Sequence, residues 1–340
     1  MKTTINDEAK DVLFKINTLI ENSKNPYFLF DDDPDGLCSF LLIYKKYKKG
    51  NFSVVRGKPR VDQNFIQIAK NHNADLIVIL DKPEMNFTEE SNRIVWIDHH
   101  PPVANNTLYF NPLNFNLEPY PTTFWVYQLI QDYDFLAALG IVTDWFLLDI
   151  VEKVAKDEKY KDLFPEKLTI EEILFNSEFG KIGKILTFLL KGESHKVKAD
   201  IKRLANIENY EKILTSFPRV KPIAKEYEKL LEKALKQEYS NVLVFLYKSK
   251  HSLTGVLSNE LLYHFPDKDL IVVGRKKLYE YSLSLRSKKY NVNRILEQSL
   301  KGIRGSGGGH EKACGAIIHE HDLELFLDNL RYFLEKEKQK

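Results

Sequence analysis

A chain of 340 residues is long enough for two domains, each with its own hydrophobic core. Hydrophobic residues make up 43% and charged residues 29%, which is ordinary for a soluble globular protein, and a formal charge of +2 gives no overall basic field for nucleic acid. No apolar run approaches a membrane span, the N-terminus is too polar for a secretory signal, and the two cysteines form no disulfide framework. These features predict a cytoplasmic protein with no membrane partner.

Short apolar segments alternate with helical patterns in the first hundred residues. Apolar spacing predicts a helix over 7–23, and an apolar run predicts a strand over 27–30. Strands that are apolar throughout and alternate with helices indicate a parallel sheet that is covered on both faces. Further strands are expected at 52–55, 74–80 and 94–97, with helices at 37–47 and around 65–69.

An acidic stretch, residues 31–36, follows the first strand. Alternate side chains of an extended chain share one side, so Asp31, Asp33 and Asp35 project together if the extension persists. Three crowded carboxylates repel one another unless a multivalent cation neutralises them. An acidic surface turn is the main alternative. An EF-hand calcium loop is excluded, because the acid that it needs at position 12 is Leu42 here.

Two later strands also end in acidic or imidazole groups. Asp81 follows the strand at 74–80, and Asp98-His99-His100 follows the strand at 94–97. Functional groups of a parallel sheet gather beyond the carboxyl ends of its strands, so these groups should converge with the acidic stretch. Carboxylates with imidazole suit manganese better than calcium, and a cluster this large suggests two ions about 3.5–4 Å apart. We assign His99 to metal and His100 to substrate phosphate or to support of a ligand, with a rigid His-His-Pro-Pro turn as the alternative.

Helical patterns dominate the middle of the chain. Helices are expected at 124–132 and 135–150, and the second contains Asp144 among apolar neighbours. A charge in such surroundings is rarely buried without a partner, although a capping or surface acid is an equal alternative. Residues 149–238 are rich in Lys and Glu and are predicted to connect two domains. Their charge is most simply a solvated helical face, with contact to a nucleic-acid backbone as the alternative.

A second domain is expected to begin near Asn241, with strands at 242–247, 270–273 and 278–285, a helix at 292–300 and a last helix at 323–335. Arg286 ends the third strand, where it could supply a bidentate phosphate contact. The run Gly305-Ser306-Gly307-Gly308-Gly309-His310 is either a flexible linker or a loop whose backbone amides approach an anion. It is not a P-loop, because no Gly-Lys-Ser/Thr follows.

Taken together, these motifs resemble those of the DHH phosphoesterase superfamily. Its four N-terminal motifs are matched in order by Asp31-x-Asp33-x-Asp35-Gly36, Asp81, Asp98-His99-His100 and Asp144. Its DHH-associated C-terminal domain is matched by Ser284-Leu285-Arg286-Ser287 and Gly308-Gly309-His310-x-x-Ala313-x-Gly315. No motif falls between residues 150 and 240.

The resemblance implies an α/β fold in two parts: a DHH domain with a parallel β-sheet and a helical extension, and a smaller α/β C-terminal domain, with a cleft between them. The DHH catalytic domain would span 1–215, with its α/β core over 1–150 and the extension over 151–215. A connecting helix would follow at 216–239, and the DHH-associated substrate-binding domain would span 240–340.

The resemblance also implies a phosphodiesterase with two Mn²⁺ ions, or Mg²⁺ in their place, in which a metal-bound hydroxide attacks phosphorus. Asp31, Asp33 and Asp81 would hold one ion, and Asp35, Asp81, His99 and Asp144 the other. Substrate would be bound by His100, Ser284, Arg286, Gly307, Gly308, Gly309 and His310.

The opening D-x-D-x-D-G resembles RecJ-type exonucleases, because oligonucleotide phosphodiesterases usually open with His, where this chain has Asp31, and carry a further acid where it has Leu37. The length resembles the compact archaeal RecJ-like proteins. The expected activity is hydrolysis of single-stranded DNA or RNA from an end, with replication or repair proteins as partners. The alternatives are a phosphodiesterase for short oligonucleotides or cyclic dinucleotides and a non-catalytic replication-fork scaffold. Lys82-Pro83 departs from the family pattern, and Lys82 either crowds the metals or contacts substrate.

Overall fold

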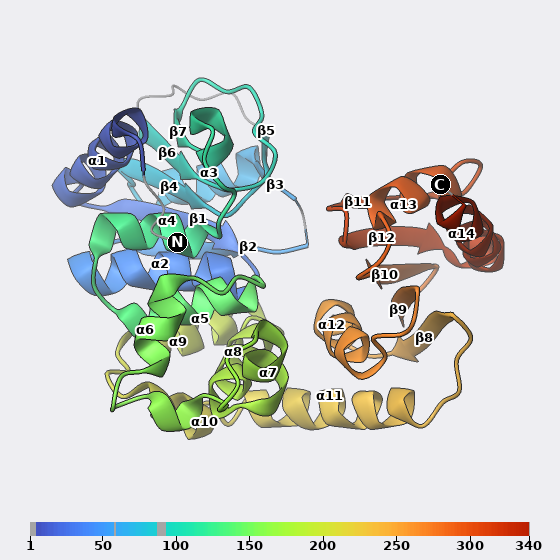
Figure 1. Ribbon diagram of the computed structural model, residues 1–340. Coiled ribbons are helices and arrows are strands. Elements are labelled where there is room, and N and C mark those ends of the chain that lie inside the picture. Colours follow the sequence, from blue (N-terminus) through green and yellow to red (C-terminus); the bar gives the residue numbers. More distant parts are fainter. Residues whose placement is uncertain (1–4, 58, 87–92, 340) are drawn as a thin grey trace. The chain divides into compact units, whose positions relative to one another are not determined.

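The computed structural model describes residues 5–57, 59–86 and 93–339 (Figure 1). It divides into two compact units, residues 1–218 and 219–340. Helix α11 (Val220–Leu235), which lies in the region of the expected connecting helix, is part of the second unit. The first four residues of the polar N-terminus lie outside the described residues. Among the described helices, none is both long and apolar enough to cross a membrane.

The first unit contains the expected parallel sheet. Its order is β2-β1-β4-β6-β7, and every neighbouring pair is parallel (Figure 1). These strands span Asn51–Val55 (β2), Pro26–Asp31 (β1), Leu76–Leu80 (β4), Ile94–Ile97 (β6) and Leu108–Phe110 (β7). The sequence patterns missed β7 and a separate parallel pair, β3 (Arg60–Asp62) and β5 (Glu84–Asn86), because three residues are too few to show a period.

Helices cover both faces of this sheet because the side chains of β1 alternate. Phe28 and Phe30 pack against Phe40 of α2 (Pro34–Tyr47), and the Phe30 and Phe40 rings are stacked with centroids 4.7 Å apart. Tyr27 and Leu29 instead join a buried cluster with the apolar side chains of α3 (Gln63–Asn71). Both faces of the strand are therefore buried, as its continuous apolar sequence predicts.

The remaining helices of the first unit are α1 (Asp7–Asn22), α4 (Thr122–Ile130), α5 (Asp134–Thr143), α6 (Asp149–Ala155), α7 (Ile170–Asn176), α8 (Glu178–Leu189), α9 (Ser194–Ala205) and α10 (Ile213–Ser216). Short 3₁₀ turns lie at Pro112–Phe115, Lys161–Leu163 and Tyr210–Lys212. The prediction of a single helix over 135–150 is wrong, because α5 ends at Thr143 and α6 begins at Asp149. Asp144 is the C-cap of α5, and Trp145 adopts a left-handed φ of 67°, which ends the helix.

A buried lysine joins the helical extension to the α/β core. Lys45 of α2 has a side chain that is 3% exposed. Its Nζ donates to the carbonyl oxygens of Ala205 (3.1 Å) and Ile207 (2.9 Å), at the C-terminal end of α9. The ammonium thus satisfies carbonyls that have no partner within the helix, and it complements the negative end of the helix dipole.

The second unit is the smaller α/β domain that the resemblance implies. Its sheet has the order β11-β12-β10-β9-β8, in which only β8 and β9 are parallel among the neighbouring pairs. After α11, its elements are β8 (Val242–Lys248), α12 (Thr254–His264), β9 (Leu270–Lys276), β10 (Glu280–Arg286), α13 (Val292–Ser299), β11 (Gly305–Gly309), β12 (Ala313–His319), a 3₁₀ turn (Glu320–Asp322) and α14 (Leu323–Lys338). The sequence patterns missed α12.

The glycine run is an edge strand, so its interpretation as a flexible linker is wrong. β11 pairs antiparallel with β12, and Gly308 lies opposite Gly315. A Cβ atom at Gly307 would lie 2.7 Å from the carbonyl oxygen of Gly315. This close approach explains a glycine at position 307 without any need for flexibility.

We expect Phe40→Ala to lower the free energy of unfolding by about 3–5 kcal/mol, because the ring is fully buried against both β1 and β2. Urea unfolding followed by circular dichroism measures the change. Phe14→Ala is the matched control, since Phe14 of α1 is 71% exposed and its loss should change stability by less than about 0.5 kcal/mol. Equal losses in the two variants would contradict this view of the core.

Candidate metal centre

Three adjacent strands bring acidic and imidazole groups to one edge of the parallel sheet. Asp31 is the last residue of β1, Asp81 directly follows β4, and Asp98 directly follows β6. The backbone N–H of Asp81 donates to the carbonyl of Ile97 at 2.9 Å, which continues the ladder past the end of the strand. The convergence predicted from the strand ends is therefore present.

The extended backbone on which a shared side for the three carboxylates depended does not persist through the acidic stretch. β1 ends at Asp31, and α2 begins at Pro34. Asp33 is the N-cap, and its Oδ1 accepts a hydrogen bond from the backbone N–H of Gly36 at 2.9 Å. A capping Asp followed by Pro favours a helix start, so Asp35 lies in the first helical turn. A Cβ at Gly36 would lie 2.7 Å from the backbone nitrogen of Asp31, so this close approach requires glycine.

The six predicted ligands, together with His100, fall into three groups that could each hold a cation. Within a group, one nitrogen or oxygen atom per residue lies within 4.8 Å of the others. The groups are Asp31, Asp33 and Asp81; Asp35, His99 and Asp144; and Asp81, His99 and His100. Because Asp81 and His99 each belong to two groups, the groups form one continuous cluster. Its oxygen and imidazole donors suit Mn²⁺ or Mg²⁺.

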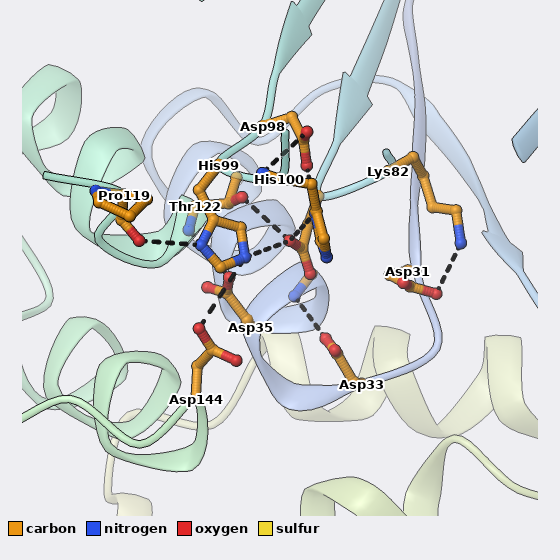
Figure 2. Close-up of polar contacts among 12 residues, drawn as sticks. Asp31, Asp33, Asp35, Lys82, Asp98, His99, His100, Pro119, Thr122 and Asp144 are labelled. Carbon is orange, nitrogen blue, oxygen red and sulfur yellow. Dashed lines mark hydrogen bonds and ion pairs between the residues drawn. The ribbon is translucent and has the colours of Figure 1, made fainter. Parts of the chain in front are cut away.

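The orientation of His99 suits a metal ligand. Its Nδ1 lies 3.1 Å from the carbonyl oxygen of Pro119, where only an N–H can donate. Its Nε2 then carries the lone pair and points at the cluster, 3.5 Å from Asp81 Oδ1 and 3.9 Å from Asp144 Oδ2 (Figure 2). Asp144 reaches the cluster from the C-cap of α5.

His100 has different surroundings. Its Nδ1 lies 2.8 Å from Oδ1 of the fully buried Asp98, and its backbone N–H donates to the other carboxylate oxygen. Burial disfavours the charged imidazole, but the hydrogen bond and the charge of Asp98 outweigh it and raise the pKa of His100 to about 10. A cationic His100 at neutral pH agrees better with phosphate binding than with metal ligation. Asn111 donates to the His100 carbonyl at 2.8 Å and holds this turn in place.

Two threonines at the start of α4 support the cluster, and the sequence analysis missed their role. The backbone N–H groups of Thr122 and Thr123 donate to the two carboxylate oxygens of Asp35, at 2.8 Å and 2.7 Å. The Thr122 hydroxyl also donates to Asp81 Oδ1 at 3.1 Å. Both threonines are fully buried. The only local signal was Pro121-Thr122-Thr123 before an apolar helix, which is typical of an ordinary helix start.

Without a cation, the cluster favours protonated carboxyl groups. Burial raises the pKa of Asp31 to about 7, assisted by the charge of Asp33 and opposed by Lys82. Burial also raises the pKa of Asp33 to about 7, assisted by the charge of Asp81. Three further pKa values are raised by burial with neighbouring carboxylates, those of Asp35, Asp81 and Asp144. Divalent cations would relieve this repulsion at neutral pH.

Lys82 contacts the cluster directly. Its Nζ lies 2.9 Å from Asp31 Oδ1, and its side chain is 2% exposed (Figure 2). Its carbonyl oxygen accepts a hydrogen bond from the indole of Trp96 at 2.9 Å, which fixes the backbone at this point. The departure from the family pattern therefore places a buried ammonium beside a candidate metal ligand.

In the second unit, three of the predicted phosphate-binding residues, Ser284, Arg286 and Gly308, lie on one face of the sheet, whereas Gly307 and Gly309 alternate to the core face. Ser284 of β10 pairs with Gly315 of β12, which pairs with Gly308 of β11. The neighbours of Ser284 in β10, Leu283 and Leu285, pack into the hydrophobic core on the opposite face. No atom lies within 4 Å of the position that a Cβ at Gly308 would take. The space directly above Gly308 on this face is thus open.

Arg286 lies at the end of β10 and is held by α12. Its Nε donates to Asn259 Oδ1 at 2.6 Å, and one terminal nitrogen donates to the carbonyl of Leu285 at 2.9 Å. Burial lowers its pKa to about 10, so it stays charged at neutral pH. The exposed His310 begins the turn after β11, where its backbone N–H donates to the carbonyl of Ala313, the residue that pairs with Arg286.

Comparisons with known proteins agree with this architecture. Residues 224–336 match the family model of the DHHA1 domain. No curated protein sequence matches the chain. A crystal structure of exonuclease RecJ bound to manganese is similar over 98% of this chain and 96% of its own, with a TM-score of 0.64 and 14% identity.

Two further solved structures share the fold. A pGpG-specific phosphodiesterase from Vibrio cholerae, PggH, aligns with 92% of this chain and 100% of its own, at a TM-score of 0.51 and 13% identity. CDC45 from Entamoeba histolytica aligns with 96% of this chain and 99% of its own, at a TM-score of 0.54 and 8% identity. At such identities the similarity establishes the two-part fold and leaves the activity to be argued from the site.

We expect the thermal stability of ion-free protein to fall as the pH rises from about 4 to about 7. The pKa values of Asp31 and Asp33 in the folded state, about 7, exceed the usual 3.8. Protonation of these carboxyl groups therefore stabilises the fold fully below about pH 4, and this stabilisation is lost as the pH rises to about 7. Mn²⁺ should therefore raise the melting temperature more at pH 7.5 than at pH 5. Differential scanning fluorimetry with EDTA or MnCl₂ measures both, and K⁺ at equal ionic strength is the control. An equal shift at the two pH values would contradict the prediction.

Proposed function

We propose that the chain is a RecJ-like member of the DHH superfamily and a manganese-dependent phosphodiesterase that hydrolyses single-stranded nucleic acid from an end; the match of residues 224–336 to the DHHA1 domain and the fold shared with RecJ support this. The observation that carries the proposal is the single cluster formed by the strand ends of β1, β4 and β6, with Asp144 added from α5. Asp81 belongs to the group with Asp31 and Asp33, and its Oδ1 also lies 3.5 Å from His99 Nε2 of the other group, which suits two ions that share a carboxylate. The RecJ structure that shares this fold is bound to manganese.

The residues of the cluster divide into ligands and supports. We assign Asp31, Asp33 and Asp81 to one ion, and Asp35, Asp81, His99 and Asp144 to the other. When bound, the ions would neutralise phosphoryl oxygens and lower the pKa of water. Around them, Pro119 fixes the His99 ring, and the N–H groups at the start of α4 fix Asp35. His100, charged through Asp98, would contact a non-bridging phosphate oxygen.

We assign the binding of further phosphates to the second unit. Arg286 offers a guanidinium whose orientation is fixed by Asn259. Ser284, on the same strand, and Gly307, Gly308, Gly309 and His310 complete this surface. The open face above Gly308 admits a sugar-phosphate backbone close to the main chain, which a side chain at that position would obstruct.

Two other functions remain as alternatives. The PggH structure shares the fold, and its name states specificity for pGpG, so a phosphodiesterase for short oligonucleotides or cyclic dinucleotides is the second candidate. The similarity to CDC45 favours a non-catalytic scaffold at the replication fork. Against the scaffold stands the complete ligand set, because a protein that only binds partners has no need for mutually repelling carboxylates in one cluster.

We expect Asp33→Asn to lower the rate of Mn²⁺-dependent hydrolysis by at least about 100-fold, because a ligand oxygen and its charge are lost. Asn is chosen because it retains the capping of α2, which Ala would remove. Asp32→Asn is the matched control: Asp32 is the next residue, it lies 3.6 Å from Lys191, and it belongs to none of the ligand groups. Release of labelled nucleotides measures the rates. Near wild-type activity of Asp33→Asn would refute the ligand assignment.

We expect Mn²⁺-loaded protein to degrade single strands of about 20 nucleotides from one end, releasing short products, and to leave duplexes largely intact. The assay uses DNA and RNA of graded length, labelled at the 5′ or the 3′ end, with products resolved on denaturing gels. Hydrolysis of dinucleotides but not of 20-mers would contradict the exonuclease and favour the phosphodiesterase for short oligonucleotides. Absence of hydrolysis together with tight binding to replication proteins would favour the scaffold.

A further inference from the structure

The two proposed metal sites differ in their ligands, because only the Asp35–His99–Asp144 group contains an imidazole, and in the buried ammonium that lies beside the Asp31–Asp33–Asp81 group. Lys82 Nζ lies 2.9 Å from Asp31 Oδ1, and Asp31 is one of the three residues of the Asp31–Asp33–Asp81 group. Figure 2 shows the Lys82 side chain directed at Asp31, on the far side of the cluster from Asp144. With a side chain only 2% exposed, Lys82 acts on Asp31 with little screening by water.

The other group has different electrostatics. The ion pairs at His99 and Asp144 join an imidazole to carboxylates, and the contacts of Asp35 are with backbone N–H groups and the charges of its neighbours. Within the described part of the chain, no lysine or arginine forms an ion pair with Asp35 or Asp144. The positive group beside this site is His100, which lies 2.8 Å from Asp98 and 4.0 Å from Asp81 and so is paired outside the group. A divalent cation that enters this group therefore meets two carboxylates and the lone pair of His99, and it displaces no ammonium from a ligand.

We propose that Lys82 makes the two metal sites unequal, so that the Asp35–His99–Asp144 group fills first and the Asp31–Asp33–Asp81 group accepts an ion only when the ammonium leaves Asp31. At low Mn²⁺ concentration, the Lys82 ammonium then takes the place of a metal ion at the Asp31–Asp33–Asp81 group. The Mn²⁺ concentration at which the cluster becomes doubly occupied is set by this lysine. The inference rests on the metal centre of the proposed function and assigns to one residue the order of loading.

The physical reason is competition for one carboxylate. A divalent ion bound to Asp31 would lie within a few ångströms of Nζ, where two like charges in a buried site repel strongly. The ion must therefore either displace the ammonium from its partner or bind beside it, and both cost affinity. Because the Lys82 backbone is held by Trp96 through a hydrogen bond of 2.9 Å, the adjustment falls on the side chain.

The experiment counts bound ions and uses no substrate. Ion-free protein is titrated with MnCl₂ while the electron paramagnetic resonance signal of free Mn²⁺ is recorded, and isothermal calorimetry gives the enthalpy of each step. We expect two steps in the wild type with dissociation constants that differ by more than about tenfold. In Lys82→Met, the weaker step should tighten by at least about tenfold and the tighter step should change by less than about twofold. An exchange-coupled pair of ions should then form at lower Mn²⁺ concentration.

Lys191→Met is the matched control, because Lys191 lies 3.6 Å from Asp32, an acid outside the ligand groups. This variant removes one positive charge near the cluster and should leave both steps within about twofold of the wild type. Lys82→Gln is a second variant for the case that methionine impairs folding, which melting curves in EDTA reveal. Two steps of equal affinity in the wild type would overturn the proposal, as would an unchanged weaker step in a folded Lys82 variant.

The outcome is separable from that of the proposed function. A protein that binds two ions in widely spaced steps but hydrolyses no phosphodiester would support the role of Lys82 and refute the enzyme. A protein that hydrolyses single strands but binds both ions equally would do the reverse.

Discussion

Repulsion among buried carboxylates at one edge of a parallel sheet is the constraint on which the first unit depends. Parallel pairing of β1, β4 and β6 places Asp31, Asp81 and Asp98 at the same edge of the sheet. The surrounding residues compensate in different ways: backbone N–H groups solvate Asp35, an imidazole holds Asp98, and an ammonium contacts Asp31. Each compensation is partial, which is why the raised pKa values persist and why cations fit the cluster.

The sequence indicated where the functional groups would gather because that information is local. An apolar run followed by an acid marks the end of a buried strand, and parallel topology follows from the alternation of strands with helices. The backbone conformation at these acidic residues was harder to predict from the sequence. Asp33 and Asp144 turned out to be caps, and a cap depends on where the neighbouring helix begins or ends, which a pattern places only to within a few residues.

Long-range contacts of residues that do not mark a strand end could not be inferred from the sequence. Thr122 supports Asp35 across 87 positions of the sequence, and Lys45 reaches Ala205 across 160. Neither residue carries a local signal that separates it from an ordinary threonine or lysine. The glycine run shows the converse case, in which composition pointed to flexibility while pairing with β12 decided the structure. Local chemistry therefore indicated what the groups were, and the fold alone determined which of them met.

Asp35 performs two tasks with one carboxylate, and this has a consequence for how such a protein can change over evolutionary time. Its oxygens accept the first N–H groups of α4, so loss of the acid would uncap a buried helix as well as remove a proposed metal ligand. A related chain that binds no metal would still be selected to keep an acceptor there. An acid at this position in a related sequence is thus weak evidence of metal binding. His99 caps no helix, so a histidine at that position is better evidence.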